Sequence, residues 1–164
     1  MNKILILDLD STLVYADSKT NRKGDFTVED YQVFVRPHVY KFLGYCFKRY
    51  TVIIWSLGTK GYVHDILNQI LTPKQKPLLV LTREDSHKID RQYFKKTEIL
   101  NELLKDHSVD YYASDITFID DRPELIIADE HIKILPIDAY ERKKDRCLNE
   151  ILVFNRYLED YICF

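Results

Sequence analysis

The stretch Lys3 to Leu7, KILIL, runs directly into Asp8-Leu9-Asp10-Ser11-Thr12. A short apolar run that ends abruptly in acids predicts a buried strand. Two later runs have the same form: Thr51 to Trp55 (TVIIW) is followed by Ser56, and Thr117 to Ile119 is followed by Asp120-Asp121. Polar side chains capable of chemistry therefore stand at the ends of three predicted strands.

Helical patterns alternate with these strands along the chain. The predicted helices cover residues 39–48, 60–71, 94–104 and 140–161, and further strands are predicted at 77–81 and 132–137. Such alternation favours an α/β fold, a doubly wound parallel sheet with helices on both faces. Residues 14–35 contain turn signals and the alternating segment Tyr31 to Val35, which predicts a short β-hairpin flap after the first strand. A length of 164 residues fits one domain over 1–164.

Glycine is scarce, since the chain has only Gly24, Gly44, Gly58 and Gly61. The spacing needed for a G-x-G-x-x-G dinucleotide loop or a G-x-x-x-x-G-K-[ST] phosphate loop is therefore absent. Any phosphate that this chain binds must be held without a glycine-rich loop.

The charge balance excludes several other classes of protein. The 24 basic and 26 acidic residues give a formal net charge of −2, which does not favour direct nucleic-acid binding. No apolar run approaches the ~20 residues that span a bilayer, so we expect no membrane association. Met1 to Asp10 becomes acidic too soon for a signal peptide, and the scattered Cys46, Cys147 and Cys163 indicate neither a disulfide framework nor a zinc site. We expect an intracellular protein, cytoplasmic or nuclear.

The polar groups at the strand ends fit phosphoryl transfer. If the strands are neighbours, one sheet edge would carry Asp8, Asp10, Ser56, Asp120, Asp121 and a lysine from Lys95-Lys96 at the start of a helix. Carboxylates so close together cannot all stay ionised without a cation, and oxygen ligands of this kind suit Mg²⁺. In such a site Asp8 would attack phosphorus to give an aspartyl-phosphate, while Asp10 would protonate the leaving oxygen and then activate water.

The order of these segments resembles a known family. Asp8 to Val14 (DLDSTLV) is similar to the D-x-D-x-T signature of haloacid-dehalogenase (HAD) phosphatases. More narrowly, the chain resembles the phosphatases of the RNA polymerase II C-terminal domain (CTD), the NLI-interacting-factor-like family. Four further segments agree in order: Arg36 to Leu43 (RPHVYKFL), Ile54 to Tyr62 (IWSLGTKGY), Tyr93 to Lys96 (YFKK) and Ile119 to Pro123 (IDDRP).

The resemblance implies a HAD-like, Rossmannoid fold and a Mg²⁺-dependent phosphatase. It makes Asp8 the nucleophile and a metal ligand, and it makes Asp10 the acid and base, with its main-chain carbonyl on the metal. The other implied roles are hydrogen bonding around the phosphate loop by Thr12, phosphoryl binding by Ser56, charge neutralisation by Lys95, completion of the metal shell by Asp121 and orientation of the site by Asp120. The expected metal site thus comprises Asp8, Asp10, Asp120 and Asp121. Lys96 stays open as an alternative to Lys95, with Lys88 as a weaker candidate.

The implied substrate is phosphoserine or phosphothreonine in a protein, such as the tail of RNA polymerase II. Other interpretations stay open: a HAD phosphatase acting on a small metabolite or a nucleic-acid 3′-phosphate, or a catalytically silent binding module. A response-regulator receiver domain is disfavoured, because Trp55-Ser56 occupies the mid-chain strand end where that class needs its phosphoacceptor. The expected partner is a phosphorylated protein or peptide, and the expected state is a monomer or weak dimer.

Overall fold

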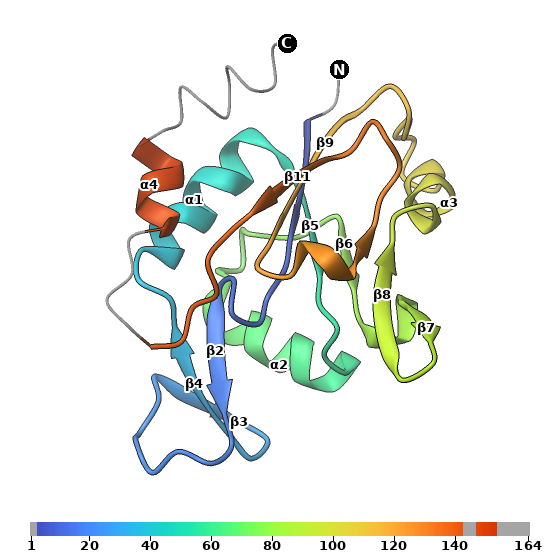
Figure 1. Ribbon diagram of the computed structural model, residues 1–164. Helices are drawn as coiled ribbons and strands as arrows, with labels where there is room; N and C mark the ends of the chain where they lie inside the picture. Colours follow the sequence, from blue (N-terminus) through green and yellow to red (C-terminus); the bar gives the residue numbers. More distant parts are fainter. Residues whose placement is uncertain (1–2, 143–146, 154–164) are drawn as a thin grey trace.

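The structure is a computed structural model that describes residues 3–142 and 147–153 of the 164-residue chain. Its centre is a five-stranded parallel sheet in the order β11-β9-β1-β5-β6 (Figure 1). The strands are β1 (Lys3–Leu7), β5 (Thr51–Trp55), β6 (Leu79–Leu81), β9 (Asp115–Asp120) and β11 (Lys133–Pro136). Leu7, the last residue of β1, pairs with Ile54 on one side and Ile119 on the other. The three strand ends that carry polar residues are therefore neighbours.

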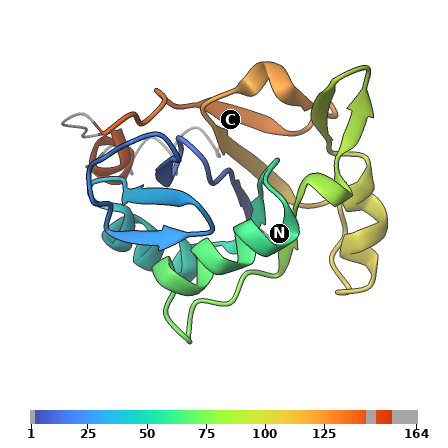
Figure 2. The same ribbon diagram turned by 90° about the horizontal axis from the view of Figure 1, so that it is seen from below.

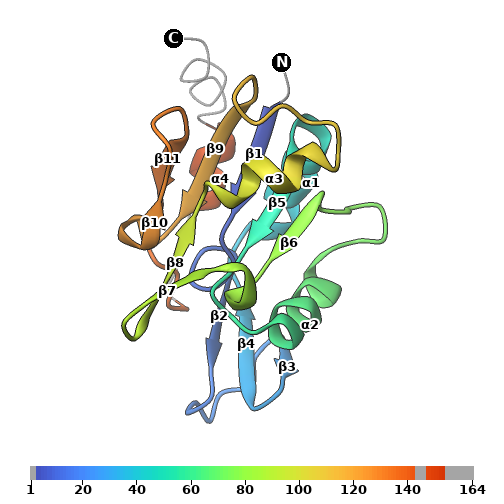
Figure 3. The ribbon, with the colours of Figure 1, turned by 90° about the vertical axis from the view of Figure 1, so that its right-hand side faces the viewer.

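Helices cover both faces of this sheet (Figures 1 and 3). One face packs against α1 (Val39–Arg49), α2 (Lys60–Ile70) and α4 (Cys147–Val153), through a core that includes Leu5 and Leu7. The other face packs against α3 (Ile99–Lys105), through a core that includes Ile4 and Ile6. Alternate residues of β1 thus enter opposite cores, as a strand buried on both faces requires. The predicted doubly wound α/β fold is confirmed.

Two small sheets accompany the central one. The first has the order β10-β8-β7 and comprises β7 (His87–Ile89), β8 (Gln92–Lys96) and β10 (Ile126–Ile127), with the short 3₁₀ turns η1 (Arg83–Asp85) and η2 (Pro123–Leu125) before β7 and β10. The second, which we call the flap sheet, comprises β2 (Val14–Asp17), β3 (Phe26–Val28) and β4 (Tyr31–Val35) in the antiparallel order β2-β4-β3. Residues 14–35 therefore form three strands rather than a single hairpin.

The flap sheet is anchored to the main core. Val28 and Val33 are buried in the same core as Val63 and Ile66 of α2, and Figure 2 shows these strands beside that helix. Because β2 begins soon after the end of β1, this anchoring places the flap sheet next to the carboxyl ends of the central strands.

The predicted helix over 94–104 is wrong at its start. Residues 94–96 lie in β8, which pairs with β7, and α3 begins only at Ile99. Ile89 pairs with Gln92, so the intervening Asp90 and Arg91 form a two-residue hairpin turn, with Asp90 in the left-handed region at φ 53°. Because α3 begins only three residues after the end of β8 at Lys96, the sequence pattern predicted one continuous helix in place of a strand followed by a helix.

The other predicted elements are confirmed with small differences at their ends, whereas β7 and β10 are additional. Of the predicted helix over 140–161, α4 covers 147–153, residues 140–142 are not helical, and 143–146 and 154–161 lie outside the described residues. Within the described part of the chain, no helix combines the length and hydropathy that crossing a membrane would require.

Candidate active site

The carboxyl ends of β1, β5 and β9 meet at a cavity of about 550 Å³. The lining residues include Asp8, Asp10, Lys95, Asp120 and Asp121, together with Tyr31 of the flap sheet and Tyr62 of α2. In open parallel sheets, ligands bind at this end of the strands. The cavity is therefore the candidate active site, and the structure brings the acids expected from the sequence to it.

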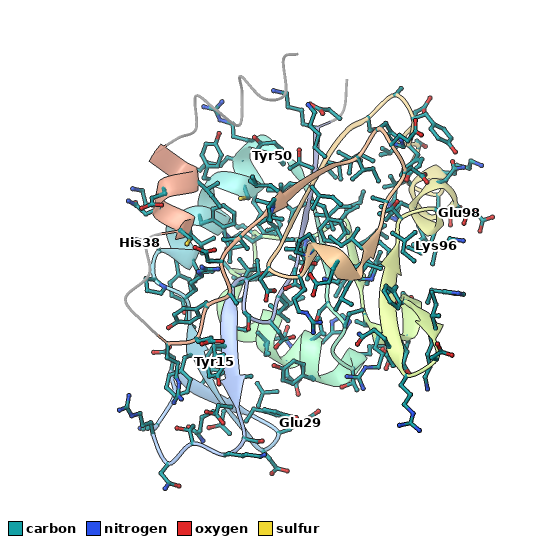
Figure 4. The ribbon with its side chains drawn as sticks, viewed as in Figure 1. Tyr15, Glu29, His38, Tyr50, Lys96 and Glu98 are labelled. Atoms are coloured by element: carbon teal, nitrogen blue, oxygen red, sulfur yellow. The ribbon has the colours of Figure 1, made fainter. Side chains whose placement is uncertain are left out.

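Lys95 is the lysine that enters the cavity. Its Nζ lies 2.6 Å from Asp8 Oδ1 and 2.6 Å from Asp120 Oδ2, and its side chain is 2% exposed. Lys96 instead forms an ion pair with Glu98 at the surface, where Figure 4 shows both side chains. Successive side chains of a strand point to opposite sides, so only one of two adjacent lysines on β8 can face the site. Lys88 of β7 is exposed and lies over the ring of Tyr93.

Three carboxylates form a compact cluster among the described residues. Asp8, Asp120 and Asp121 each place an oxygen within 4.8 Å of the others. Burial raises the pKa of the Asp8 carboxyl to about 8, and burial together with the charge of Asp120 raises the pKa of Asp121. The single ammonium of Lys95 cannot balance three carboxylates, and a divalent cation would favour their ionised forms. The donor set, made of carboxylate oxygens alone, fits a hard cation such as Mg²⁺.

Lys95 and the chain around β9 determine how the cluster is arranged. Burial lowers the pKa of Lys95, but the carboxylates of Asp8 and Asp120 outweigh that effect and hold the pKa above its ordinary value. The other oxygen of Asp120, Oδ1, accepts a 2.8 Å hydrogen bond from the Arg122 N–H. Both oxygens of Asp120 thus have donors, which suits a residue that orients the site.

The carboxylate of Asp10 does not join this cluster, although the sequence led us to expect four converging carboxylates. Asp10 Oδ1 accepts a 2.5 Å hydrogen bond from the Tyr62 hydroxyl, and Oδ2 accepts one of 3.2 Å from Ser56 Oγ. Asp8 and Asp10 thus have different partners although they are only two residues apart. Burial raises the pKa of Asp10 although both hydrogen bonds lower it, a direction that suits a group that exchanges protons.

Thr12 connects the loop after β1 to the end of β9. Its Oγ1 donates to Asp121 Oδ1 at 3.2 Å and accepts from the Asp121 N–H at 3.3 Å. Ser56 is fully buried and also accepts a 3.0 Å hydrogen bond from the Gly58 N–H, at the end of β5. Both hydroxyls are therefore buried behind the cavity lining, and each is hydrogen-bonded to one of the acids that line it.

Two residues of the site had no role assigned from the sequence. Arg36 is 1% exposed, and its guanidinium donates to the main-chain carbonyls of Thr12 at 3.1 Å, Ser11 at 3.4 Å and Asp138 at 2.6 Å. It thereby fastens the loop after β1 to the segment after β11. Tyr62 is the second, through its bond to Asp10. The sequence features that could have identified them are the position of Arg36 just before Pro37 and the position of Tyr62 at the start of the helix that follows Ser56.

Comparisons with known proteins match one family over most of the chain. A family model described as NLI interacting factor-like phosphatase matches residues 3–161. The CTD phosphatase-like protein 355R of Invertebrate iridescent virus 3 is 26% identical, over 97% of this chain and 96% of the viral protein. The protein of the same name from Invertebrate iridescent virus 6 is 31% identical, over 62% of this chain and 64% of that protein.

Solved structures share the fold. Fission yeast Fcp1, an RNA polymerase II CTD phosphatase solved with beryllium fluoride bound, matches with a TM-score of 0.53 and 20% identity, over 96% of this chain and 56% of the Fcp1 chain. A HAD-like family hydrolase from Porphyromonas gingivalis matches with a TM-score of 0.54 and 15% identity, over 96% of this chain and 98% of that chain. This chain thus spans little more than half the length of the Fcp1 chain. At such identities the likeness shows the HAD-like fold.

Proposed function

Because the chain belongs to the NLI interacting factor-like phosphatase family, we propose that it is a Mg²⁺-dependent phosphatase that removes phosphate from phosphoserine or phosphothreonine in a protein. The observation that carries this proposal is the division of the acids into two groups. Asp8, Asp120 and Asp121 form one cluster in which Asp8 and Asp120 contact Lys95, whereas the carboxylate of Asp10 is bound by two hydroxyls. A phosphatase that uses a covalent intermediate needs this division between a nucleophile and a proton donor.

The first half of the reaction transfers the phosphoryl group to Asp8. A carboxylate oxygen of Asp8 forms a bond to phosphorus, the bond between phosphorus and the serine or threonine oxygen breaks, and Asp10 gives its proton to that oxygen. Lys95 and the hydroxyl of Ser56 offset the charge on the phosphoryl oxygens. Positioning and electrostatic stabilisation dominate phosphoryl transfer, so pre-set hydrogen bonds at this cavity suit the chemistry.

The second half hydrolyses the aspartyl-phosphate. A water molecule attacks phosphorus and passes its proton to Asp10, the bond between phosphorus and the Asp8 oxygen breaks, and inorganic phosphate leaves. Asp10 is thereby returned to its protonated form. Thr12 and Arg36 keep the loop that carries Asp8 and Asp10 in one conformation throughout.

The residues that would hold Mg²⁺ are Asp8 and Asp121, with the main-chain carbonyl of Asp10 as a third ligand and Asp120 beside them. Bound there, the ion would supply a positive charge next to the transferring phosphoryl group. Asp120 serves chiefly to orient Lys95, since both of its oxygens already accept hydrogen bonds.

The short segment between Ser56 and Lys95 favours a phosphate carried on a macromolecule over one carried on a small metabolite. Between Ser56 and Lys95 the chain forms only α2, β6, η1, β7 and part of β8, so no large cap domain is inserted there. The names of the viral relatives and of Fcp1 point to the polymerase II tail as a substrate of that kind. A small metabolite and a nucleic-acid 3′-phosphate are the competing substrates, and a binding module without activity is the competing function.

One screen separates these possibilities. Purified protein is given phosphoserine and phosphothreonine peptides, including polymerase tail repeats, and in parallel sugar phosphates and 3′-phosphorylated oligonucleotides, each with Mg²⁺ or with EDTA. We expect phosphate release from the peptides that EDTA abolishes and that Asp8→Asn lacks. Preference for sugar phosphates or oligonucleotides would replace the substrate class, and equal results for the wild type and Asp8→Asn would remove the enzyme assignment.

A further inference from the structure

Asp10, the proposed general acid, is hydrogen-bonded by a tyrosine from a different element. Tyr62 lies in the first turn of α2, and its hydroxyl donates the 2.5 Å hydrogen bond to Asp10 Oδ1. The bond from Ser56 to Oδ2 is longer, at 3.2 Å. Since Ser56 is expected to turn its hydroxyl to an incoming phosphoryl group, Tyr62 is the donor that can stay on Asp10 throughout the reaction.

The ring of Tyr62 is itself enclosed. A Cβ atom at Gly58 would lie 2.7 Å from Tyr62 Cδ1, closer than non-bonded carbons come, so the absence of a side chain at Gly58 makes room for the ring. From the other side, the ring of Tyr31 in the flap sheet meets Tyr62 edge to face, with centroids 5.5 Å apart. Tyr62 is 8% exposed. The hydroxyl therefore has little freedom to leave Asp10.

We propose that Tyr62 is a positioning residue for Asp10. Its hydroxyl holds Oδ1, so that Oδ2 faces the leaving-group oxygen, and Gly58 and Tyr31 fix the ring that carries the hydroxyl. The flap sheet is thereby part of the catalytic apparatus through Tyr31. This inference rests on the proposed function, because the orientation of Asp10 affects the rate only if Asp10 transfers a proton.

The proposal has a kinetic consequence that packing alone would not produce. A nitrophenolate leaves phosphorus without needing a proton, whereas phenolate and alkoxide groups depend on one. Proton transfer by a placed side chain contributes about 10² to 10⁴-fold, and displacing a reacting group by about 1 Å can cost about 10²-fold. Loss of the Tyr62 hydroxyl should therefore slow poor leaving groups much more than good ones.

The test measures kcat/KM, which reports the steps up to departure of the leaving group, on a series of aryl phosphates of graded leaving-group pKa and on a phosphoserine peptide. Tyr62→Phe keeps the ring and removes the hydroxyl. Gly58→Ala keeps the hydroxyl and displaces the ring. We expect both variants to lose on the order of tenfold to a hundredfold on phenyl phosphate and the peptide, but less than about threefold on p-nitrophenyl phosphate.

Matched controls identify the cause. A Cβ at Gly61 would meet nothing within 4 Å, so Gly61→Ala tests a glycine replacement in the same segment. Tyr112→Phe removes a tyrosine hydroxyl from a side chain that is 67% exposed and is not part of the cavity lining. Both controls should keep the wild-type dependence on leaving-group pKa. Tyr31→Ala should steepen that dependence more than Tyr31→Phe, which retains the ring.

Two results would overturn the inference in different ways. If Tyr62→Phe and Gly58→Ala keep the wild-type dependence while KM rises, Tyr62 contacts substrate and does not position Asp10. If the wild type releases no phosphate from any substrate, the proposed function fails and the inference fails with it. Circular dichroism of each variant identifies misfolding, and Gly58→Ala and Tyr62→Phe serve as independent perturbations of one contact.

Discussion

The ammonium of Lys95 lies 2.6 Å from Asp8 Oδ1, across 87 residues of sequence and between two different sheets. Asp8 follows β1 of the central sheet, whereas Lys95 lies on β8, which pairs with β7 and β10. The same ammonium reaches Asp120 at 2.6 Å, after a third strand. Charges buried to this degree depend on one another for compensation, because water is excluded from them. The small sheet is therefore as necessary to the site as the central one.

Replacing Lys95 by methionine should remove both ion pairs while keeping the volume of the side chain. Asp8 and Asp120 would be left with an uncompensated negative charge, and breaking a buried pair costs about 3–5 kcal/mol. We expect a lower free energy of unfolding in EDTA by about that amount, and a fall in kcat on the order of a hundredfold or more, because a donor to the phosphoryl oxygens is lost. Urea unfolding and steady-state kinetics measure the two effects.

Lys96→Met is the matched control for that experiment. Lys96 forms its ion pair with Glu98 at the surface, where both side chains are about half exposed or more, and exposed pairs contribute little. Both stability and kcat should stay near wild type. A loss of activity in Lys96→Met with little loss in Lys95→Met would contradict the assignment of the inward lysine.

The stability of the metal-free protein should fall as the pH rises. Burial raises the pKa of Asp8 from its model-compound value of 3.8 to about 8. A carboxyl whose folded pKa lies above its unfolded pKa favours folding while protonated, and this contribution is lost as the pH rises through the folded value. The metal-free protein should therefore become less stable between about pH 5 and about pH 8.

Mg²⁺ should reverse that trend, since a cation favours ionised carboxylates. The rise in Tm on adding Mg²⁺ should be larger at about pH 8 than at about pH 6, because at the higher pH the ion has fewer protons to displace from the carboxyl groups. Thermal unfolding with MgCl₂, compared with KCl at equal ionic strength, measures this difference. An equal or smaller shift at the higher pH would show that the cluster of Asp8, Asp120 and Asp121 does not bind the ion.

Arg36→Met should loosen the loop after β1. The change removes the donor to three main-chain carbonyls at a side chain that is 1% exposed. Leaving buried acceptors unpaired costs about 1–3 kcal/mol per group, and we expect a total loss of about 3 kcal/mol in the free energy of unfolding. Urea unfolding measures it, with Arg91→Met, in the exposed turn between β7 and β8, as the control. Equal stability of the two variants would show that Arg36 does not anchor the loop.

Ser11 should tolerate glycine and resist valine. Its φ of 59° lies in the left-handed region, whereas none of the four glycines, all within the described residues, has a positive φ. That conformation costs a residue with a Cβ about 1–2 kcal/mol and costs glycine almost nothing. We expect Ser11→Gly to raise or keep Tm and Ser11→Val to lower it. Both variants lack the hydroxyl, so their order reports on the backbone alone. A lower Tm for Ser11→Gly than for Ser11→Val would contradict a left-handed conformation at this position.

Much of the fold and of the candidate site follows from the sequence, because three apolar strands that end in polar residues determine both the sheet and the edge that carries those residues. The ends of β1, β5 and β9 are adjacent, so Asp8 and Asp120 meet at the cavity and Ser56 bonds to Asp10 beside them. The D-x-D-x-T stretch also leads to Thr12, whose hydroxyl lies in a short loop after β1 and bonds to Asp121.

The remaining features depend on contacts between distant segments. Whether Lys95 or Lys96 faces the site depends on the register of β8, and a pattern that resembled a helix concealed that strand. The partner of Asp10 could not be identified from spacing, because Tyr62 reaches it from another element and requires the missing side chain of Gly58. The role of Arg36 likewise depends on carbonyl groups, which every residue carries and no sequence pattern distinguishes.

The central claim is that Asp8 carries the phosphoryl group during turnover. The most direct test mixes the enzyme with excess phosphoserine peptide and Mg²⁺, quenches the reaction in acid within the first turnovers, and maps phosphorylation of the chain by mass spectrometry. We predict phosphate on Asp8, none on the chain in Asp8→Asn, and loss of the labelled species once the substrate is exhausted. Steady phosphate release with Asp8 unmodified, and with Asp8→Asn as active as the wild type, would contradict the account.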